Sequence, residues 1–134
     1  MILVDTSVWI AAHRGRDQRA AATLDALIDA DEALLALPVR IELMAGVAAR
    51  DRRALRLGLG ALPLAMPTED TWSLLESWLA PAAAAGHRFA VTDLLIAALA
   101  AQRGALVWSL DADFARMEAL EFVRLFAGSV TAPQ

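Results

Sequence analysis

The first seven residues place a carboxylate at the end of a buried strand. Ile2, Leu3 and Val4 form a continuous apolar run that stops at Asp5. Such a run is typical of a strand covered on both faces, because a strand with one face in water alternates apolar and polar residues. In an open α/β sheet, ligands bind at the edge formed by the carboxyl ends of the strands. Asp5 is therefore the first candidate for a functional residue.

The composition predicts one folded domain over residues 1–134, with a loose tail after about residue 127. Apolar residues make up 58% of the chain, so a disordered chain is excluded. The chain contains no cysteine, which excludes disulfides and thiolate metal sites. There is no signal peptide and no run of roughly 18 apolar residues, so we expect a soluble, cytoplasmic protein that does not enter a membrane.

The net charge of −4 argues against a protein that coats nucleic acid by bulk electrostatic attraction. It leaves open an enzyme that acts on nucleic acid through bound cations, because the metal then carries positive charge to the phosphate.

Apolar periodicity predicts strands and helices that alternate along the chain, which indicates a mostly parallel sheet with helices on both faces. We expect strands at 2–4, 33–37, 105–108 and 122–125, with a short edge strand near 62–66. We expect helices at 6–12, 18–30, 38–49, 51–59, from 68 onward, at 92–103 and at 114–120.

Two of these helices carry specific expectations. Trp72, Leu75 and Leu79 recur at helical spacing and predict a buried stripe that serves as core packing or as a dimer face. Thr92 is the expected N-cap of the helix that carries Asp93, and a glycine at position 104 is expected to end that helix.

Glu42 lies in a predicted helix that is apolar nearly all round, and such a helix is buried. A glutamate in that position is costly unless it is paired or bound to a cation. An ion pair with one of the many arginines is the alternative to a cation site.

Four acids are expected to meet at one edge of the sheet. Asp5 and Asp111 each follow a strand, Asp93 starts a helix, and Glu42 comes from the helix after the second strand. Each has an ordinary explanation as a cap, a first-turn residue or a turn residue. The recurrence of an acid at the same kind of position favours one shared site.

Carboxylates held together in a poorly solvated crevice repel one another, and a divalent metal relieves the repulsion. Mg²⁺ prefers hard oxygen ligands, whereas His13 and His87 lie among loop-like residues and do not favour zinc. A bound Mg²⁺ or Mn²⁺ ion activates water and polarises a phosphodiester. The pattern thus predicts metal-dependent hydrolysis of a nucleic-acid backbone.

Four segments, in order and spacing, resemble the PIN-domain ribonucleases, and specifically the VapC-type toxins of bacterial type II toxin–antitoxin pairs. The segments are Ile2-Leu3-Val4-Asp5-Thr6-Ser7, Arg40-Ile41-Glu42-Leu43-Met44-Ala45-Gly46, Thr92-Asp93-Leu94-Leu95-Ile96-Ala97-Ala98 and Ser109-Leu110-Asp111-Ala112-Asp113-Phe114. The chain departs from the family pattern at position 109, where serine replaces the common threonine and keeps the hydroxyl.

The resemblance implies a PIN-like three-layer α/β/α sandwich with a mostly parallel sheet and Mg²⁺- or Mn²⁺-dependent endonucleolytic cleavage of RNA. It implies a homodimer and a cognate VapB-like antitoxin. It also implies residue roles: catalysis and metal binding by Asp5, Glu42, Asp93 and Asp111, metal binding by Asp113, and orientation of the carboxylates by Thr6 and Ser109.

Two groups of arginines are candidates for contact with RNA phosphates or with the antitoxin. They are Arg14 and Arg16 (with Arg19) and Arg50 and Arg53 (with Arg52 and Arg56). A solvated helix face is an equally good explanation for them.

Other functions compatible with the sequence are a PIN nuclease in RNA processing or on structured DNA, and a non-catalytic module whose acids bind a cation or an arginine-rich peptide. A phosphoryl-transfer domain with an aspartate nucleophile is disfavoured, because no second aspartate stands two positions after Asp5.

Overall fold

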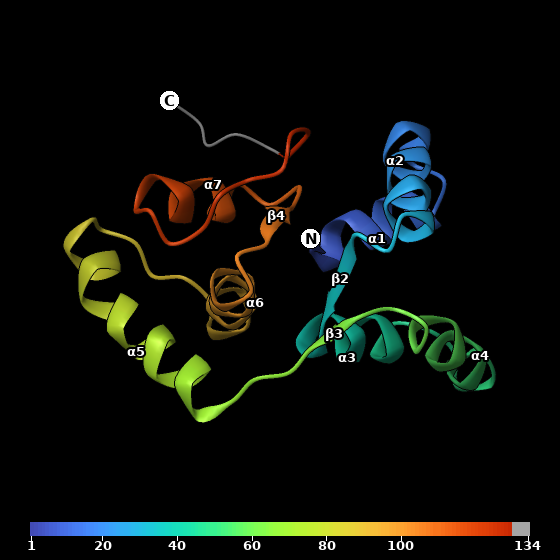
Figure 1. Cartoon of the computed structure of the whole chain (residues 1–134), viewed down its shortest axis with the longest axis horizontal. Coiled ribbons are helices and arrows are strands. Elements are labelled where there is room, and N and C mark those ends of the chain that lie inside the picture. Colours follow the sequence, from blue (N-terminus) through green and yellow to red (C-terminus); the bar gives the residue numbers. More distant parts are fainter. Residues whose placement is uncertain (130–134) are drawn as a thin grey trace.

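The computed structural model describes residues 1–129 and contains a four-stranded parallel sheet (Figure 1). The strands lie in the order β3-β2-β1-β4, and every pairing between them is parallel. Their bounds are β1 (Ile2–Val4), β2 (Ala33–Ala36), β3 (Leu64–Ala65) and β4 (Leu106–Trp108). The predicted parallel sheet and its short edge strand are confirmed.

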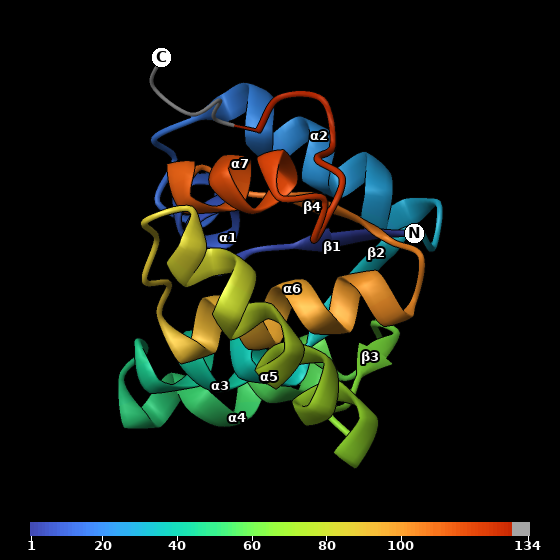
Figure 2. The ribbon, with the colours of Figure 1, turned by 90° about the vertical axis from the view of Figure 1, so that its left-hand side faces the viewer.

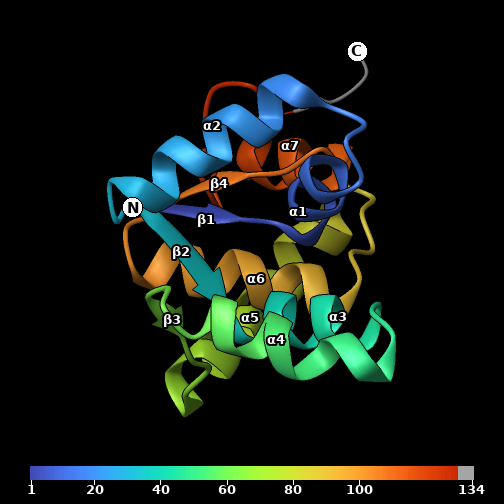
Figure 3. The same cartoon turned by 90° about the vertical axis from the view of Figure 1, so that its right-hand side faces the viewer.

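Helices cover both faces of this sheet (Figures 2 and 3). One face carries α1 and α2, the other carries α3, α5 and α6, and α7 packs on α6 beside β4. The helix bounds are α1 (Thr6–His13), α2 (Gln18–Asp29), α3 (Leu37–Ala45), α4 (Ala49–Leu59), α5 (Glu69–Ala84), α6 (Val91–Gln102) and α7 (Ala112–Ala119). The predicted α/β/α architecture is therefore confirmed. Among residues 1–129, no helix combines the length and the apolar character needed to cross a bilayer.

The order in which strands are added to the sheet reverses at β1. The chain runs from β1 outward to β2 and β3, and then returns to β4 on the other side of β1. Val4 pairs with Trp108, and the Asp5 amide donates to the Trp108 carbonyl oxygen at 2.9 Å. The crevice between the carboxyl ends of β1 and β4 is thus a topological switch point, the place where open α/β sheets bind ligands.

Strand β1 divides the apolar core into two parts, because its side chains alternate between the faces of the sheet. Ile2 and Val4 pack with Val8 of α1 and Leu24 of α2. Leu3 points to the opposite face and joins the larger cluster, which includes most of α6. Packing on both faces of the sheet therefore fixes β1, the strand that ends at Asp5.

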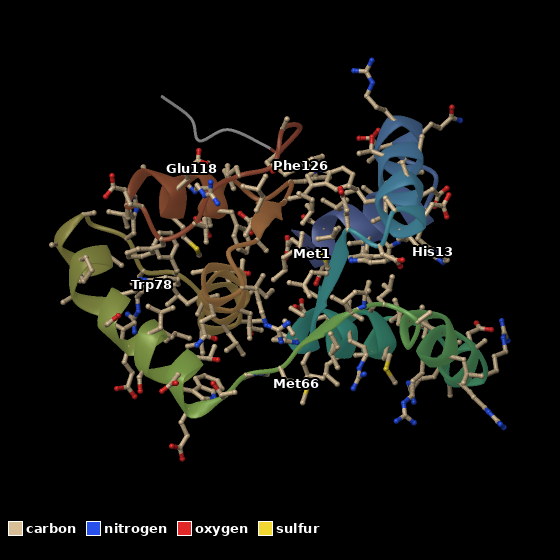
Figure 4. The ribbon with its side chains drawn as sticks, viewed as in Figure 1. Met1, His13, Met66, Trp78, Glu118 and Phe126 are labelled. Atoms are coloured by element: carbon tan, nitrogen blue, oxygen red, sulfur yellow. The ribbon has the colours of Figure 1, made fainter. Side chains whose placement is uncertain are left out.

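The buried stripe predicted for α5 is confirmed at Leu75, which is 5% exposed, and is wrong at Trp72 and Leu79. Trp72 is 44% exposed and Leu79 is 50% exposed, whereas Trp78 is 8% exposed and stacks on Phe122 with ring centroids 4.5 Å apart (Figure 4). Apolar residues occupy both flanks of this helix, so their spacing alone does not select the inner one. The true stripe includes the polar Thr71, whose hydroxyl donates to Gln102 at 2.6 Å.

Two further expectations require correction. Helix α6 begins at Val91 with Ala90 at the N-cap position, so Thr92 is not the cap. Glycine 104, with φ +60°, ends that helix as predicted. The strand expected at 122–125 is a single bridge between Val107 and Leu125. The tail expected after residue 127 is described only at 128 and 129, and residues 130–134 lie outside the described part of the chain.

Helix α3 is less buried than predicted. Only Val39 is buried, and Ile41 is 54% exposed. Apolar residues on the outer side of α3 lie at the edge of the molecule, where the described residues provide no further layer to cover them. The cost of burying a glutamate in a helix that is apolar all round therefore does not apply to Glu42.

The corrected α5 stripe predicts that two tryptophans of one helix differ in their effect on stability. We expect Trp78→Ala to lower the free energy of unfolding by about 3–5 kcal/mol, because it empties a buried, stacked site. Trp72→Ala, the matched control, is expected to cost under about 1 kcal/mol. Urea titration followed by circular dichroism measures both values, and equal losses would contradict this assignment of the inner face.

Candidate active site

Asp5 is buried at the switch point and is held by two serine hydroxyls. It occupies the N-cap position of α1, but its side chain accepts no capping hydrogen bond from the backbone amides of that helix. One carboxylate oxygen, Oδ2, instead accepts from Ser7 Oγ at 2.8 Å and from Ser109 Oγ at 2.8 Å. A capping role therefore does not explain this carboxylate, which is oriented by neighbours on two separate segments.

The same two serines tie the end of β1 to the loop after β4. Ser7 Oγ accepts from the Leu110 amide at 3.0 Å, and Ser109 Oγ accepts from the Asp111 amide at 3.0 Å. Sequence reasoning missed Ser7, although a hydroxyl two positions after a strand-end acid was the available signal. Thr6, predicted to orient a carboxylate, makes no hydrogen bond to Asp5, and its buried hydroxyl has no partner of good geometry among the described residues.

Three aspartates approach one another beside Asp5. One carboxylate oxygen from each of Asp93, Asp111 and Asp113 lies within 4.8 Å of the other two. Asp93 is in the first turn of α6, and Asp111 is the N-cap of α7, where it accepts from the Asp113 amide at 2.9 Å. Asp111 thus has the capping role as well as a place in the cluster. Asp113 is partly neutralised, because Arg116 donates to it at 2.7 Å.

Asp93 shows that the five acids share one electrostatic environment. Burial raises the pKa of Asp93 to about 6, and the charges of Asp5, Asp111, Asp113 and Glu42 act in the same direction. A first-turn aspartate stabilised only by the helix dipole would have a lowered pKa instead. The structure therefore clusters Asp93, Asp111 and Asp113 and places Asp5 and Glu42 near enough for their charges to act on Asp93.

Glu42 reaches the crevice from α3, which packs against α1. Although the residue as a whole is exposed, partial burial raises the pKa of its carboxyl group, and the charge of Asp5 raises it further while the nearby Thr6 hydroxyl lowers it. The ion pairs found among residues 1–129 join Arg50 to Asp51 and Arg116 to Asp113. Pairing of Glu42 with an arginine, the alternative suggested by the sequence, is not observed there.

A groove of about 520 Å³ runs from Glu42 between α1, α3 and α4. Most of its lining is apolar, with Arg14 and His13 at the α1 side. Arg14 thus lines the same groove as Glu42. Arg50 and Arg53 are exposed on α4, which also lines the groove, and Arg16 is exposed between α1 and α2.

A family model described as "PIN domain" matches residues 2–120, which is most of the chain and includes all five acids. The chain belongs to the PIN-domain family. A curated relative, Ribonuclease VapC5 of Mycobacterium tuberculosis (strain ATCC 25618 / H37Rv), is 32% identical over 133 residues, and the match covers 92% of both chains.

Solved structures share this PIN-domain fold. The VapBC-5 toxin–antitoxin structure from Mycobacterium tuberculosis matches with a TM-score of 0.66 and 26% identity, covering 96% of this chain and 97% of that one. A toxin–antitoxin complex from Klebsiella pneumoniae matches with a TM-score of 0.76 and 15% identity, covering 97% and 100%. At that identity the second match shows the fold alone.

The raised pKa of Asp93 predicts a pH-dependent gain in stability when its charge is removed. The folded protein binds a proton at Asp93 with a pKa of about 6, whereas the unfolded chain binds it at the ordinary aspartate pKa of 3.8. Between pH 3.8 and about 6 the folded state binds more protons at Asp93 than the unfolded chain does. The free energy of unfolding therefore falls as the pH rises through this range. We expect Asp93→Asn to raise the melting temperature of the metal-free PIN domain above about pH 6, and the gain to vanish below about pH 4.

Asp70→Asn is the matched control, because Asp70 is an exposed acid in the first turn of α5. Only the helix dipole acts in its favour, so its removal is expected to leave the melting temperature unchanged or slightly lower. Thermal unfolding in EDTA across this pH range measures both variants. A loss of stability in Asp93→Asn at neutral pH would show that repulsion does not dominate at this position.

Proposed function

We propose that this PIN domain is a metal-dependent endoribonuclease that acts as the toxin of a toxin–antitoxin pair. The observation that carries the proposal is the convergence of five carboxylates at the switch point, expressed in the pKa of about 6 at Asp93. The curated relative named a ribonuclease and the neighbours described as toxin–antitoxin complexes support it.

The donor set fits Mg²⁺ or Mn²⁺. Every candidate ligand is a carboxylate oxygen, the hard donor that these ions prefer, and the cluster lacks the nitrogen and sulfur donors typical of zinc sites. Asp5, Glu42, Asp93 and Asp111 would hold the metal, and Asp113 would contribute if it leaves Arg116. A bound ion supplies activation of water and charge neutralisation at the phosphodiester.

The chain's own residues contribute orientation. Ser7 and Ser109 fix one oxygen of Asp5 and leave the other available to a ligand. Asp93, whose pKa is raised to about 6, is suited to hold a proton in the crevice near that pH, and burial raises the pKa of Glu42 in the same direction. The two serines of the sequence motifs thus determine the direction of the central carboxylate.

The groove beside Glu42 is suited to an antitoxin of the VapB type. Its apolar lining from Trp9, Ile10, Leu43, Val47 and Leu55 fits the apolar face of a helical peptide segment. The groove opens next to the acids, so a segment bound there would also block access of RNA to them. A homodimer is part of this proposal as well, as expected from the family.

Removal of single acids tests the catalytic assignment. We expect Asp5→Asn, Glu42→Gln and Asp93→Asn each to reduce RNA cleavage more than about 100-fold, because even the outer partners of metal ligands are worth about 10–100-fold. Cleavage of total RNA by purified protein with Mn²⁺ or Mg²⁺, and its loss in EDTA, is the measurement. Growth arrest on induced expression should disappear with the same variants.

Glu76→Gln is the control for these variants, because Glu76 is an exposed acid of α5 outside the crevice. It is expected to cut RNA and arrest growth like the wild type. Full cleavage by Asp5→Asn would reject the assigned site. A wild-type protein that binds Mn²⁺ but cuts no RNA would indicate a binding module instead of an enzyme.

Arginines on α4 are proposed to contact RNA outside the cleavage site. Arg53 and Arg50 are exposed, and the pairing of Arg50 with Asp51 is long, at 3.9 Å. We expect the double variant Arg50→Ala/Arg53→Ala to weaken RNA binding about 3- to 10-fold near physiological salt. We also expect the slope of log affinity against log salt concentration to become shallower by about 2, which corresponds to the loss of two phosphate contacts. Binding is measured with catalytically inactive Asp5→Asn protein.

Arg124→Ala serves as the matched control, because Arg124 lies in a separate hollow beside the C-terminal end of α6. It is expected to bind RNA with unchanged affinity and salt dependence. Equal losses in the double variant and in the control would mean that RNA senses only net charge and not the α4 surface.

A further inference from the structure

Ser129, far from the acids in sequence, is bonded to the segment that orients Asp5. Its hydroxyl donates to the Val107 carbonyl oxygen at 3.2 Å and accepts from the Ser109 amide at 3.2 Å. Val107 and Ser109 flank the end of β4, which has no neighbouring strand on that side. The hydroxyl therefore accepts from the Ser109 amide and adds a second hydrogen bond to the Val107 carbonyl oxygen, at the point where the chain enters the crevice.

A tight turn brings Ser129 to this position. The Phe126 amide donates to the Val107 carbonyl oxygen at 2.8 Å, and the Ser129 amide donates back to the Phe126 carbonyl oxygen at 3.2 Å. Gly128 stands at the third position of this four-residue turn with φ +98°, a conformation that favours glycine. The Phe126 ring packs on Trp108 with centroids 5.3 Å apart, which fixes the turn against β4 (Figure 4).

Ser109 connects Ser129 to the acids, because its backbone amide bonds Ser129 and its hydroxyl bonds Asp5 and the Asp111 amide. Ser129 Oγ holds the Ser109 amide, Ser109 Oγ donates to Asp5 at 2.8 Å, and Ser109 Oγ also accepts from the Asp111 amide at 3.0 Å. Only Ser109 stands between the turn and two of the proposed metal ligands. Outer partners of this kind orient ligands and tune their affinity for metal.

We propose that Ser129 is a positioning residue of the active site, acting through Ser109 to set the orientation of Asp5 and Asp111. The inference rests on the proposed function, in which those two carboxylates bind a divalent cation. It extends the site to the turn at residues 126–129, which lies outside the region matched by the family model.

Calorimetric titration of the full-length protein with Mn²⁺, in the absence of RNA, measures the effect on the ligands. Ser129→Ala is expected to weaken Mn²⁺ binding about 10-fold. Ser129→Thr keeps the hydroxyl and is expected to restore most of the affinity. Ser73→Ala, the control at an exposed serine of α5, should bind Mn²⁺ like the wild type. Wild-type affinity in Ser129→Ala would overturn the proposal.

Amide hydrogen exchange in the metal-free protein provides a second measurement. In Ser129→Ala the amides of Ser109 and Asp111 are expected to exchange faster, while the amide of Leu24, buried in α2, exchanges as in the wild type. Gly128→Ala is expected to act in the same direction, because alanine is strained at that φ. Faster exchange at Ser109 alone, or throughout the protein including Leu24, would overturn the positioning role.

The two measurements also separate this inference from the proposed function. If the wild-type protein bound no Mn²⁺, the metal-dependent function would fail. The exchange rates at Ser109 and Asp111 would still decide whether the turn positions the loop after β4.

Discussion

Repulsion among carboxylates at one edge of the sheet is the constraint on which this structure depends. Asp5, Glu42, Asp93, Asp111 and Asp113 come from four separate segments, and each would gain by moving away from the others. Burial is the largest cause of the raised pKa of Asp93, and the charges of the other four acids raise it further, so a proton is retained where ordinary aspartates have lost it. The fold must therefore hold these segments in place against a force that the site itself generates.

The parallel sheet supplies that restraint through backbone hydrogen bonds. The pairing of β1 with β4 is fixed in register from Ile2 to Val4, and the bond from the Asp5 amide to the Trp108 carbonyl extends it by one residue. Leu3 and Val4 have no exposed surface, so the strand cannot shift without losing packing on both faces. Asp5 is held at the crevice by groups that carry no charge and are insensitive to its repulsion from Asp93.

Much of this arrangement could be predicted from the sequence, because continuous apolar runs ending in acids identify the strands and their carboxyl ends. Asp5 and Asp111 were located in this way, and α6 was recognised by its glycine at position 104. The inner face of α5 could not be predicted, since Trp72 and Trp78 are equally apolar and only the position of Phe122 selects between them. The burial of α3 was overestimated for a similar reason, because periodicity does not reveal which face a neighbouring layer covers.

The bond from Ser7 to Asp5 is local, but the bond that joins Ser7 to Leu110 spans more than a hundred positions and those of Ser129 span about twenty, and no local pattern encodes such contacts. Their importance follows from the same repulsion. In the absence of metal, a cluster of charged ligands lowers the stability of the folded protein. A cation that binds only the folded state restores that stability. Neutral hydroxyls are suited to orient such a cluster, because they fix carboxylate oxygens without neutralising the charge that attracts the cation. Arg116 shows the contrast, since its bond to Asp113 provides orientation at the cost of that acid's charge.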